Sequence, residues 1–203
     1  MKTLLILVLF FLVLSGSTFS QTTYENLSRS KALTDQIPVR DIRKTAVWLN
    51  MGWNGITGFG ALVSYFVVPK IAVDAGLGLS SEGIKISGRG RYLFTTKNFT
   101  PFAGLGFMYG LGTPTDFEST DPNNNDEIYR IKVNESPFIQ ITGGFEYMAK
   151  KGFFTLFNVG YAILLKSCNY EITAGNPVGE TRKALDMAFG SGIVIEGGIG
   201  YAF

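Results

Sequence analysis

Apolar residues alternate with small or polar residues along most of the chain from about residue 44 onward. Successive side chains of a strand point to opposite faces, so this period of two predicts strands. Eight segments are predicted, at 44–53, 56–68, 70–80, 83–95, 98–112, 136–149, 152–166 and 189–203. They are longer than the ~5 to 6 residues of an average strand and suit the tilted strands of ~9 to 11 residues that cross a bilayer.

The two faces of the predicted strands differ in character, and the last strand shows this best. One face carries Ile193, Ile195, Ile199, Tyr201 and Phe203, and the other carries Gly192, Glu196, Gly198, Gly200 and Ala202. In a soluble barrel the apolar face lies inside and the outer face is polar. Here the face opposite the apolar one is largely glycine, which suits a narrow lumen better than a surface in water. The pattern therefore favours a membrane barrel with its apolar belt outside.

The same alternation assigns six charged side chains to the inside of this barrel. The acids are Asp74, Glu146 and Glu196, and the bases are Lys85, Arg89 and Arg91. A charge in a narrow, partly dehydrated interior is costly unless it is paired, so a structural network is predicted. The alternative is that these groups line an ion path. Eight strands enclose only enough room for side chains to fill, which favours the structural role.

The connections between the segments are of two kinds. Val68-Pro69, 95–98 and 149–152 are tight turns, whereas 113–135 and 167–188 are long and polar. An even strand count places the tight turns at one end and the long loops at the other, the periplasmic and extracellular arrangement of outer-membrane barrels. Aromatic residues near the tight-turn ends suit an interfacial girdle, although core aromatics would give a similar pattern. They are Phe94, Phe99, Tyr147, Phe153, Tyr201 and Phe203.

The first 20 residues have the order of a secretory signal peptide. Met1-Lys2 is followed by an apolar run over 4–14 and a small, polar stretch over 15–20. An apolar helix of this length covers about 16 Å, roughly half of the ~30 Å hydrocarbon layer, so a spanning anchor is the weaker interpretation. Residues 21–43 carry mixed charges and Pro38, and are interpreted as a periplasmic N-terminal arm or a short helix against the barrel mouth.

Composition excludes several kinds of chemistry. The 203 residues include 18 Lys and Arg, 16 Asp and Glu, one Cys and no His. The near balance of charge gives no field that would attract nucleic acid. Without His, a Ser-His hydrolase and the Cys/His metal sites are excluded, and the single Cys168 cannot form an internal disulfide. The acidic segment 121–127 lacks the order of a calcium loop. No catalytic, cofactor or metal site is predicted.

The end of the sequence carries a specific resemblance. Ile199-Gly200-Tyr201-Ala202-Phe203 is similar to the C-terminal strand by which the assembly machinery recognises bacterial outer-membrane barrels. The segment 91–94 followed by 99–106, PFAGLG at its end, is similar to a strand pair of small barrel domains. Over 44–203 the chain resembles the OmpA/OmpX-type barrels. The resemblance implies location in the bacterial outer membrane, contact with its lipid, and assembly through Ile199, Tyr201 and Phe203.

The predicted fold class is all-β, an eight-stranded antiparallel up-and-down transmembrane β-barrel with short periplasmic turns and longer extracellular loops. The predicted domains are a signal peptide over 1–20, the arm over 21–43 and the barrel over 44–203. The favoured function is non-enzymatic, structural or interacting with an outside partner through 113–135 and 167–188. The resemblance supports this, since the known enzymatic small barrels use a His. A narrow pore or small-solute transporter, and below it a secreted lipophile-binding barrel, are the alternatives.

Overall fold

The structure is a computed structural model that describes residues 37–121 and 127–203. Residues 38–203 form one compact unit. The predicted signal peptide and the arm up to residue 36 lie outside the described residues. Neither of the helices in the described residues has the length and apolar character that a membrane-spanning helix requires.

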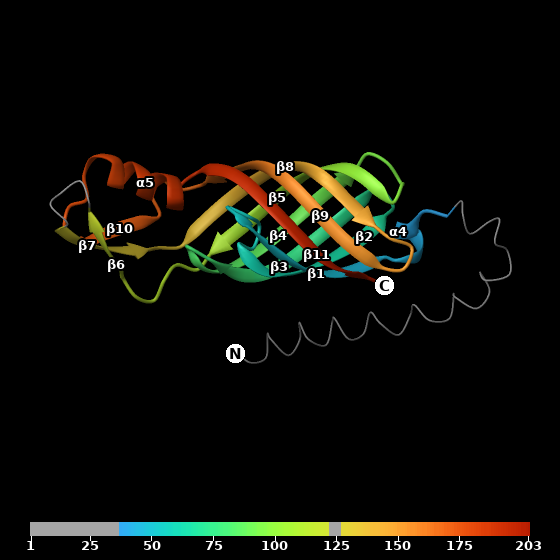
Figure 1. The fold of residues 1–203 in the computed structure, drawn as a ribbon, viewed down its shortest axis with the longest axis horizontal. Coiled ribbons are helices and arrows are strands. Elements are labelled where there is room, and N and C mark those ends of the chain that lie inside the picture. The colour runs from blue at the N-terminus through green and yellow to red at the C-terminus, as the bar shows by residue number, and fades with distance from the viewer. Residues whose placement is uncertain (1–36, 122–126) are drawn as a thin grey trace. The chain divides into compact units, whose positions relative to one another are not determined.

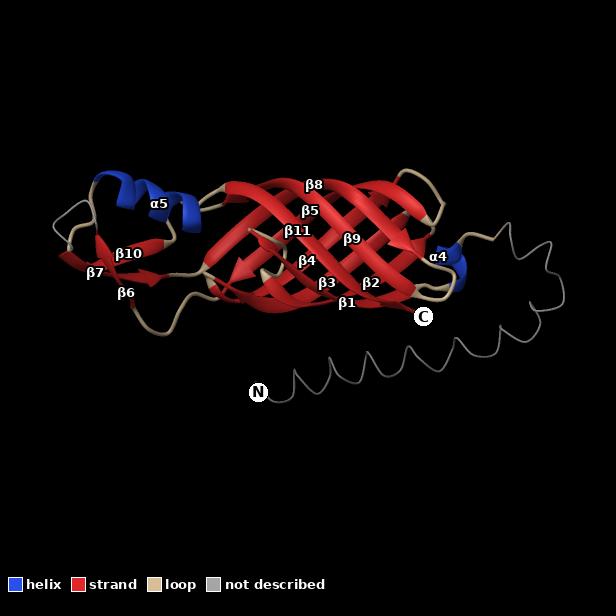
Figure 2. Cartoon of the chain, in the orientation of Figure 1, coloured by secondary structure: helices blue, strands red, loops and turns tan. Residues whose placement is uncertain are grey.

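Among the described residues, eight long strands close into an antiparallel barrel (Figures 1 and 2). Their order around the barrel is β1-β11-β9-β8-β5-β4-β3-β2. The strands are β1 (Thr45–Trp53), β2 (Phe59–Val68), β3 (Ile71–Ser80), β4 (Gly83–Leu93), β5 (Phe99–Gly110), β8 (Ser136–Met148), β9 (Phe153–Leu164) and β11 (Gly192–Ala202). The predicted closed eight-stranded antiparallel barrel is confirmed, with every predicted boundary within three residues of the observed one.

The two ends of the barrel differ in their connections. The turns β2–β3, β4–β5 and β8–β9 lie at the end that carries both barrel termini, which we call the turn end. The segments 111–135 and 165–191 leave from the opposite end, the loop end, which also carries the short connections 54–58 and 81–82. Gly152 closes β8–β9 with φ of +102°, and a Cβ there would lie 2.5 Å from the Tyr201 ring, so only glycine fits this turn.

Apolar side chains point away from the barrel. Along β9, Phe157 is 53% exposed while the neighbouring Asn158 is fully buried, and the alternation holds on either side. The six aromatic residues proposed as a girdle are all exposed, between 38% for Tyr147 and 57% for Phe99. Their interpretation as ordinary core aromatics is therefore wrong.

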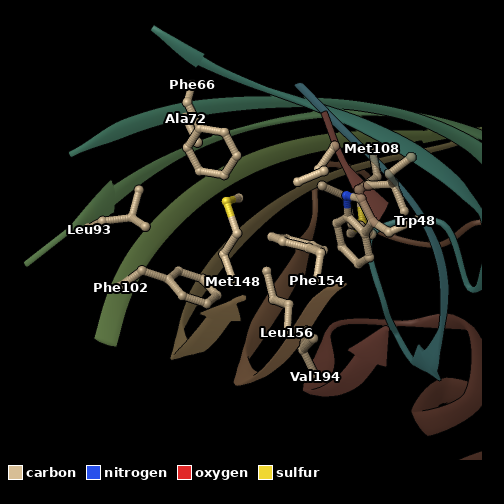
Figure 3. Packing of buried hydrophobic residues seen from close by; sticks show 14 of the residues in the cluster. Trp48, Phe66, Ala72, Leu93, Phe102, Met108, Met148, Phe154, Leu156 and Val194 are labelled. Atoms are coloured by element: carbon tan, nitrogen blue, oxygen red, sulfur yellow. The ribbon is translucent and has the colours of Figure 1, made fainter. Parts of the chain in front are cut away.

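The interior is filled, and it is more apolar than the sequence indicated. A cluster of large apolar side chains packs inside the barrel, with Trp48 and Phe154 in ring contact at 5.7 Å (Figure 3). Phe66, Phe102 and Met148 point into the same space (Figure 3). Glycines on the neighbouring strands make room for them, since a Cβ on Gly198 of β11 would lie 2.4 Å from the Trp48 ring of β1. The expectation of a small and polar inner face is thus corrected: glycines alternate with large residues across neighbouring strands.

The two long polar segments are not loops throughout. They contribute β6 (Phe117–Asp121), β7 (Glu127–Val133) and β10 (Tyr170–Ala174), which form a three-stranded sheet in the order β10-β7-β6. Helix α5 (Gly179–Phe189) packs on this sheet through Leu185 and Phe189, which meet Tyr129 and Ile131. We call these four elements the loop sheet (Figure 2). The prediction of two open loops is corrected, because each segment buries apolar residues against the other.

The glycines of the strands give a direct test of the packing. Gly198→Ala should lower the free energy of unfolding by about 1–3 kcal/mol, because its methyl group would collide with the buried Trp48 ring. Gly90→Ala is the matched control, since a Cβ there meets nothing within 4 Å, and it should change stability by less than about 0.5 kcal/mol. Urea unfolding followed by tryptophan fluorescence measures both. Equal effects of the two substitutions would contradict the assigned inner face.

Candidate functional site

A set of buried charges occupies the middle of the barrel, beginning on the adjacent strands β3 and β4. Asp74 on β3 lies opposite Arg89 on β4 in the strand register. Its Oδ2 accepts hydrogen bonds from Nε of Arg89 at 2.9 Å and from Nε of Arg91 at 2.8 Å. Ser64 donates a further hydrogen bond to Oδ1 at 2.7 Å. One carboxylate thus joins two guanidinium groups.

The set continues on one side to β11. Nη1 of Arg89 donates to Oε1 of Glu196 at 2.5 Å. Glu196 also accepts from Nδ2 of Asn158 at 2.6 Å and from the backbone N–H of Ile56 at 2.7 Å. The Ile56 contact ties the short β1–β2 connection into the lumen. Both oxygens of the buried carboxylate are therefore engaged.

On the other side the set reaches the turn end. Arg91 pairs with Glu146 on β8, and Glu146 accepts from Nε of Arg40 at 2.8 Å. Arg40 comes from the short helix α4 (Val39–Ile42), and its Nη1 donates to the backbone carbonyl of Lys97 at 2.8 Å. A residue of the N-terminal segment thus enters the barrel and completes the charge set.

Together these six residues form a chain in which charge alternates in sign. We call it the ion-pair ladder, and its order is Arg40, Glu146, Arg91, Asp74, Arg89, Glu196. The ladder is electrically balanced, and its side chains are 0% exposed. Charges withdrawn from water this far are tolerated only when paired and hydrogen-bonded, and each carboxylate here has at least two donors.

Aromatic rings cover the guanidinium groups of the ladder. The guanidinium carbon of Arg91 lies 5.3 Å from the centre of the Phe102 ring, and that of Arg89 lies 5.9 Å from the Trp48 ring. These distances are within the range of cation–π attraction. The apolar cluster and the ladder are thus one packed interior, in which the rings take the place of water on the faces of the cations.

The structure brings five of the six predicted lumen charges together and leaves one apart. Lys85 is buried as the alternation indicated, but its Nζ pairs with Glu82 of the β3–β4 connection at 3.1 Å, outside the ladder. The predicted network is corrected at this position, where Arg40 takes the third basic place. Alternation fixes which face a residue takes but not its height in the barrel, and Lys85 lies toward the loop end of β4. Arg40 carried no signal of this kind because it precedes the first strand.

Some buried polar atoms have no hydrogen-bond partner among the described residues. They include Nη2 of Arg89, Oγ1 of Thr142, Oδ1 of Asn50 and Oε1 of Gln140, all facing the interior. Buried polar groups of this kind commonly hold ordered water. These atoms are the polar groups of the interior at which ordered water would find a hydrogen-bond partner.

The loop sheet is held by hydrogen bonds between its two chain segments. Asp121 of β6 accepts from the backbone N–H of Val178 at 2.9 Å and from the hydroxyl of Thr181 at 2.5 Å, at the start of α5. The Tyr170 hydroxyl donates to Asp186 at 2.6 Å. Partial burial and this bond to a carboxylate raise the pKa of Tyr170 to about 12. The two segments therefore form one folded element.

The acidic segment considered as a calcium loop begins with Asp121, whose carboxylate oxygens are used at the start of α5. Residues 122–126 lie outside the described residues. In the part of the chain that the structure describes, no group of three or more Cys, Asp or Glu is placed to hold a metal ion. Cys168 is exposed and free.

The C-terminal residues lie on the outside of the barrel. Ile199, Tyr201 and Phe203 are 61%, 52% and 45% exposed. Strand β11 pairs with β1 along its length, and the backbone N–H of Phe203 donates to the carbonyl of Thr45 at 2.8 Å. The final strand thus closes the barrel against the first and leaves its alternate side chains facing outward.

Comparison with known proteins finds no match in sequence and a distant likeness to solved structures. No family model matches the chain, and no curated protein matches it significantly in sequence. The solved structures that the chain resembles include the two that follow. The N-terminal β-barrel domain of Pseudomonas aeruginosa OprF is 13% identical over 79% of this chain and 98% of that one, with a TM-score of 0.46. Acinetobacter baumannii CarO is 12% identical over 83% and 99%, with a TM-score of 0.35.

By its fold and interior, the chain is a small, closed, eight-stranded antiparallel barrel. Its outer face is apolar, and its lumen is charged and filled by side chains. The predicted closed eight-stranded antiparallel barrel is confirmed by the strand order of the chain itself.

The end of the ladder on β11 provides a double-mutant test. Arg89→Met should lower the free energy of unfolding by about 3–5 kcal/mol, because Glu196 would keep a buried negative charge without its cation. Combining it with Glu196→Gln restores the charge balance and should recover part of that loss. Urea unfolding of the wild type, both single variants and the double variant measures the coupling. Strictly additive losses would show that the two side chains do not depend on each other.

Proposed function

We propose that this protein is a non-enzymatic barrel of the bacterial outer membrane, with a structural role and an outward-facing loop sheet for interaction. The observation that carries the proposal is the distribution of side chains across the wall. Large apolar residues cover the outside, as Leu105 and Ile195 do at 61% and 50% exposure, while the ladder lies inside. Soluble monomers rarely expose apolar patches above a few hundred Å², so a surrounding lipid phase is the medium that suits this surface.

The soluble lipophile-binding alternative fits the interior poorly. Such a barrel needs an apolar cavity for its ligand, at the place where this chain packs Trp48, Phe102 and Phe154 against the charged ladder. It would also leave the exposed belt of Phe, Ile and Leu in water. Burying that belt in lipid removes this cost.

The packed interior favours a closed barrel over a pore. Each carboxylate of the ladder is held by at least two donors, and rings lie on the cations, so opening a path requires breaking several charge-assisted contacts together. We assign the ladder the role of bracing the wall, because it links α4, β3, β4, β8 and β11.

A narrow pore is a second candidate, and the unpartnered polar atoms favour it. Water held by Asn50, Gln140 and Thr142 would provide the upper part of a path. In this case the ladder would form the constriction of the pore, and ions would pass only when its side chains rearrange. Conductance measured across a planar bilayer separates the two candidates.

The orientation follows from the ends of the barrel. With the turn end in the periplasm, the loop sheet faces the outside. Its outer face carries Glu118, Arg130 and Lys132, with Glu118 and Arg130 in an exposed ion pair at 2.8 Å. This mixed and nearly balanced surface suits a protein or saccharide partner rather than nucleic acid. Export by the signal peptide and insertion by the barrel assembly machinery, reading Ile199, Tyr201 and Phe203, complete the proposal.

The proposal predicts fractionation with the outer membrane and a mobility in detergent gels that depends on heating. The unboiled protein should run as a compact barrel and the boiled protein as an unfolded chain, because the closed wall resists detergent until heated. Reconstituted protein should show no steady conductance. Recovery in a soluble fraction with no heat-dependent shift would overturn the membrane assignment, and a stable conductance with the shift retained would favour the pore.

A further inference from the structure

A cleft of about 450 Å³ lies at the rim of the loop end. It is bounded by the last residues of β1, the first of β2, and the β3–β4 connection, and Ala188 of α5 lines it as well. The two connections here, 54–58 and 81–82, are the short ones of this end. The cleft is therefore lined both by outward-facing residues of the wall and by residues of a rim connection.

One side of the cleft is apolar and belongs to the outer surface. Met51, Phe59 and Leu79 line it, and they are neighbours across β1, β2 and β3 in the strand register. They are 66%, 61% and 61% exposed. Trp53 lines the same side and is 57% exposed. These residues make a continuous apolar row across the three strands along this side of the cleft.

The floor of the cleft is charged. Lys85 and Glu82 line it, and their side chains are only 2% and 1% exposed. Glu82 also accepts a hydrogen bond from the hydroxyl of Ser80 at 2.6 Å, and the ammonium of Lys85 lies 5.6 Å from the centre of the Phe138 ring. Ser81, which is exposed, stands at the entrance. The pair is separate from the ladder, so it is not needed to balance the lumen.

A buried ion pair away from the ladder has a desolvation cost that a hydrophobic pair of similar size would avoid. Here the pair is Lys85 and Glu82, whose Nζ and Oε2 atoms lie 3.1 Å apart at the floor of the cleft. A ligand with a single negative charge would approach Glu82 as closely as Lys85, and one with a single positive charge would meet Lys85. A head group that carries both charges a few bonds apart can place each against its opposite.

We propose that this cleft binds a zwitterionic amphiphile with an amine and a phosphate in its head group and its hydrocarbon chain along Met51, Phe59 and Leu79. The amine faces Glu82, the phosphate faces Lys85 and the Ser81 hydroxyl, and the chain stays in the lipid layer. The proposal rests on the membrane location proposed above. It goes beyond it by assigning a specific lipid site to one sector of the wall.

Tryptophan fluorescence can report binding at this cleft. It has two tryptophans, of which Trp53 lines the cleft and Trp48 is buried inside the barrel, donating to Ser64 at 2.9 Å. In a Trp48→Phe background, fluorescence reports on Trp53 alone. Protein in maltoside micelles is titrated with lysophosphatidylethanolamine, and separately with lysophosphatidylglycerol of the same chain length as the anionic probe.

The expected result is a saturable change in Trp53 fluorescence with the zwitterionic lipid, at least tenfold tighter than with the anionic lipid. Equal or tighter binding of the anionic lipid would overturn the head-group assignment. A change that rises with lipid content and never saturates would show solvation by bulk lipid and overturn the site itself.

Two substitutions of exposed residues separate the site from general effects. Ser81→Tyr fills the entrance of the cleft and should weaken binding of the zwitterionic lipid at least tenfold. Thr96→Tyr places the same side chain on the exposed turn at the opposite end and should leave binding unchanged. Unchanged binding in Ser81→Tyr would contradict the proposal. Both variants should keep the heat-dependent gel mobility, so failure of the lipid site is distinguishable from failure of the membrane assignment.

Discussion

The pairing of charge inside a space too narrow for free water is the constraint on which this structure depends. Eight strands leave room for side chains only, and this chain places six charged groups there as an alternating ladder. The four inner groups of the ladder each have two partners of opposite charge, and removing any one group leaves the buried set with a net charge, so strands distant in sequence are fixed relative to one another. Arg40 extends this dependence to the segment before the barrel, because Glu146 is shared between Arg40 and Arg91.

The filled interior and the apolar exterior follow from the same alternation. Glycines at inward positions of β11 leave room for the Trp48 ring of the neighbouring β1, which covers the guanidinium group of Arg89. The outward positions are then free to carry large apolar residues. Where the connections are short, at the β1–β2 and β3–β4 ends, the polar mouth and the apolar outer surface come together, and the Glu82–Lys85 pair lies at that junction.

The fold was predictable from the sequence because period-two alternation is a local signal, and it placed all eight strands and the inward charges. The partners of those charges were less predictable. Lys85 has the inward parity of Arg89 and Arg91 but lies nearer the loop end, and Arg40 lies outside any strand. The loop sheet gave the weakest signal, since β6 and β10 have five residues each and bury their apolar side chains only when two separate segments meet.

The central claim is that the apolar face of the wall points toward lipid and the charged face toward the lumen. The two tryptophans of β1 test it directly, because Trp53 is 57% exposed and Trp48 is 1% exposed. Single-tryptophan variants, Trp48→Phe and Trp53→Phe, are reconstituted in bilayers of lipids with brominated chains, which quench a tryptophan on contact. The account predicts strong quenching of Trp53 and little quenching of Trp48. Strong quenching of Trp48, or none of Trp53, would contradict it.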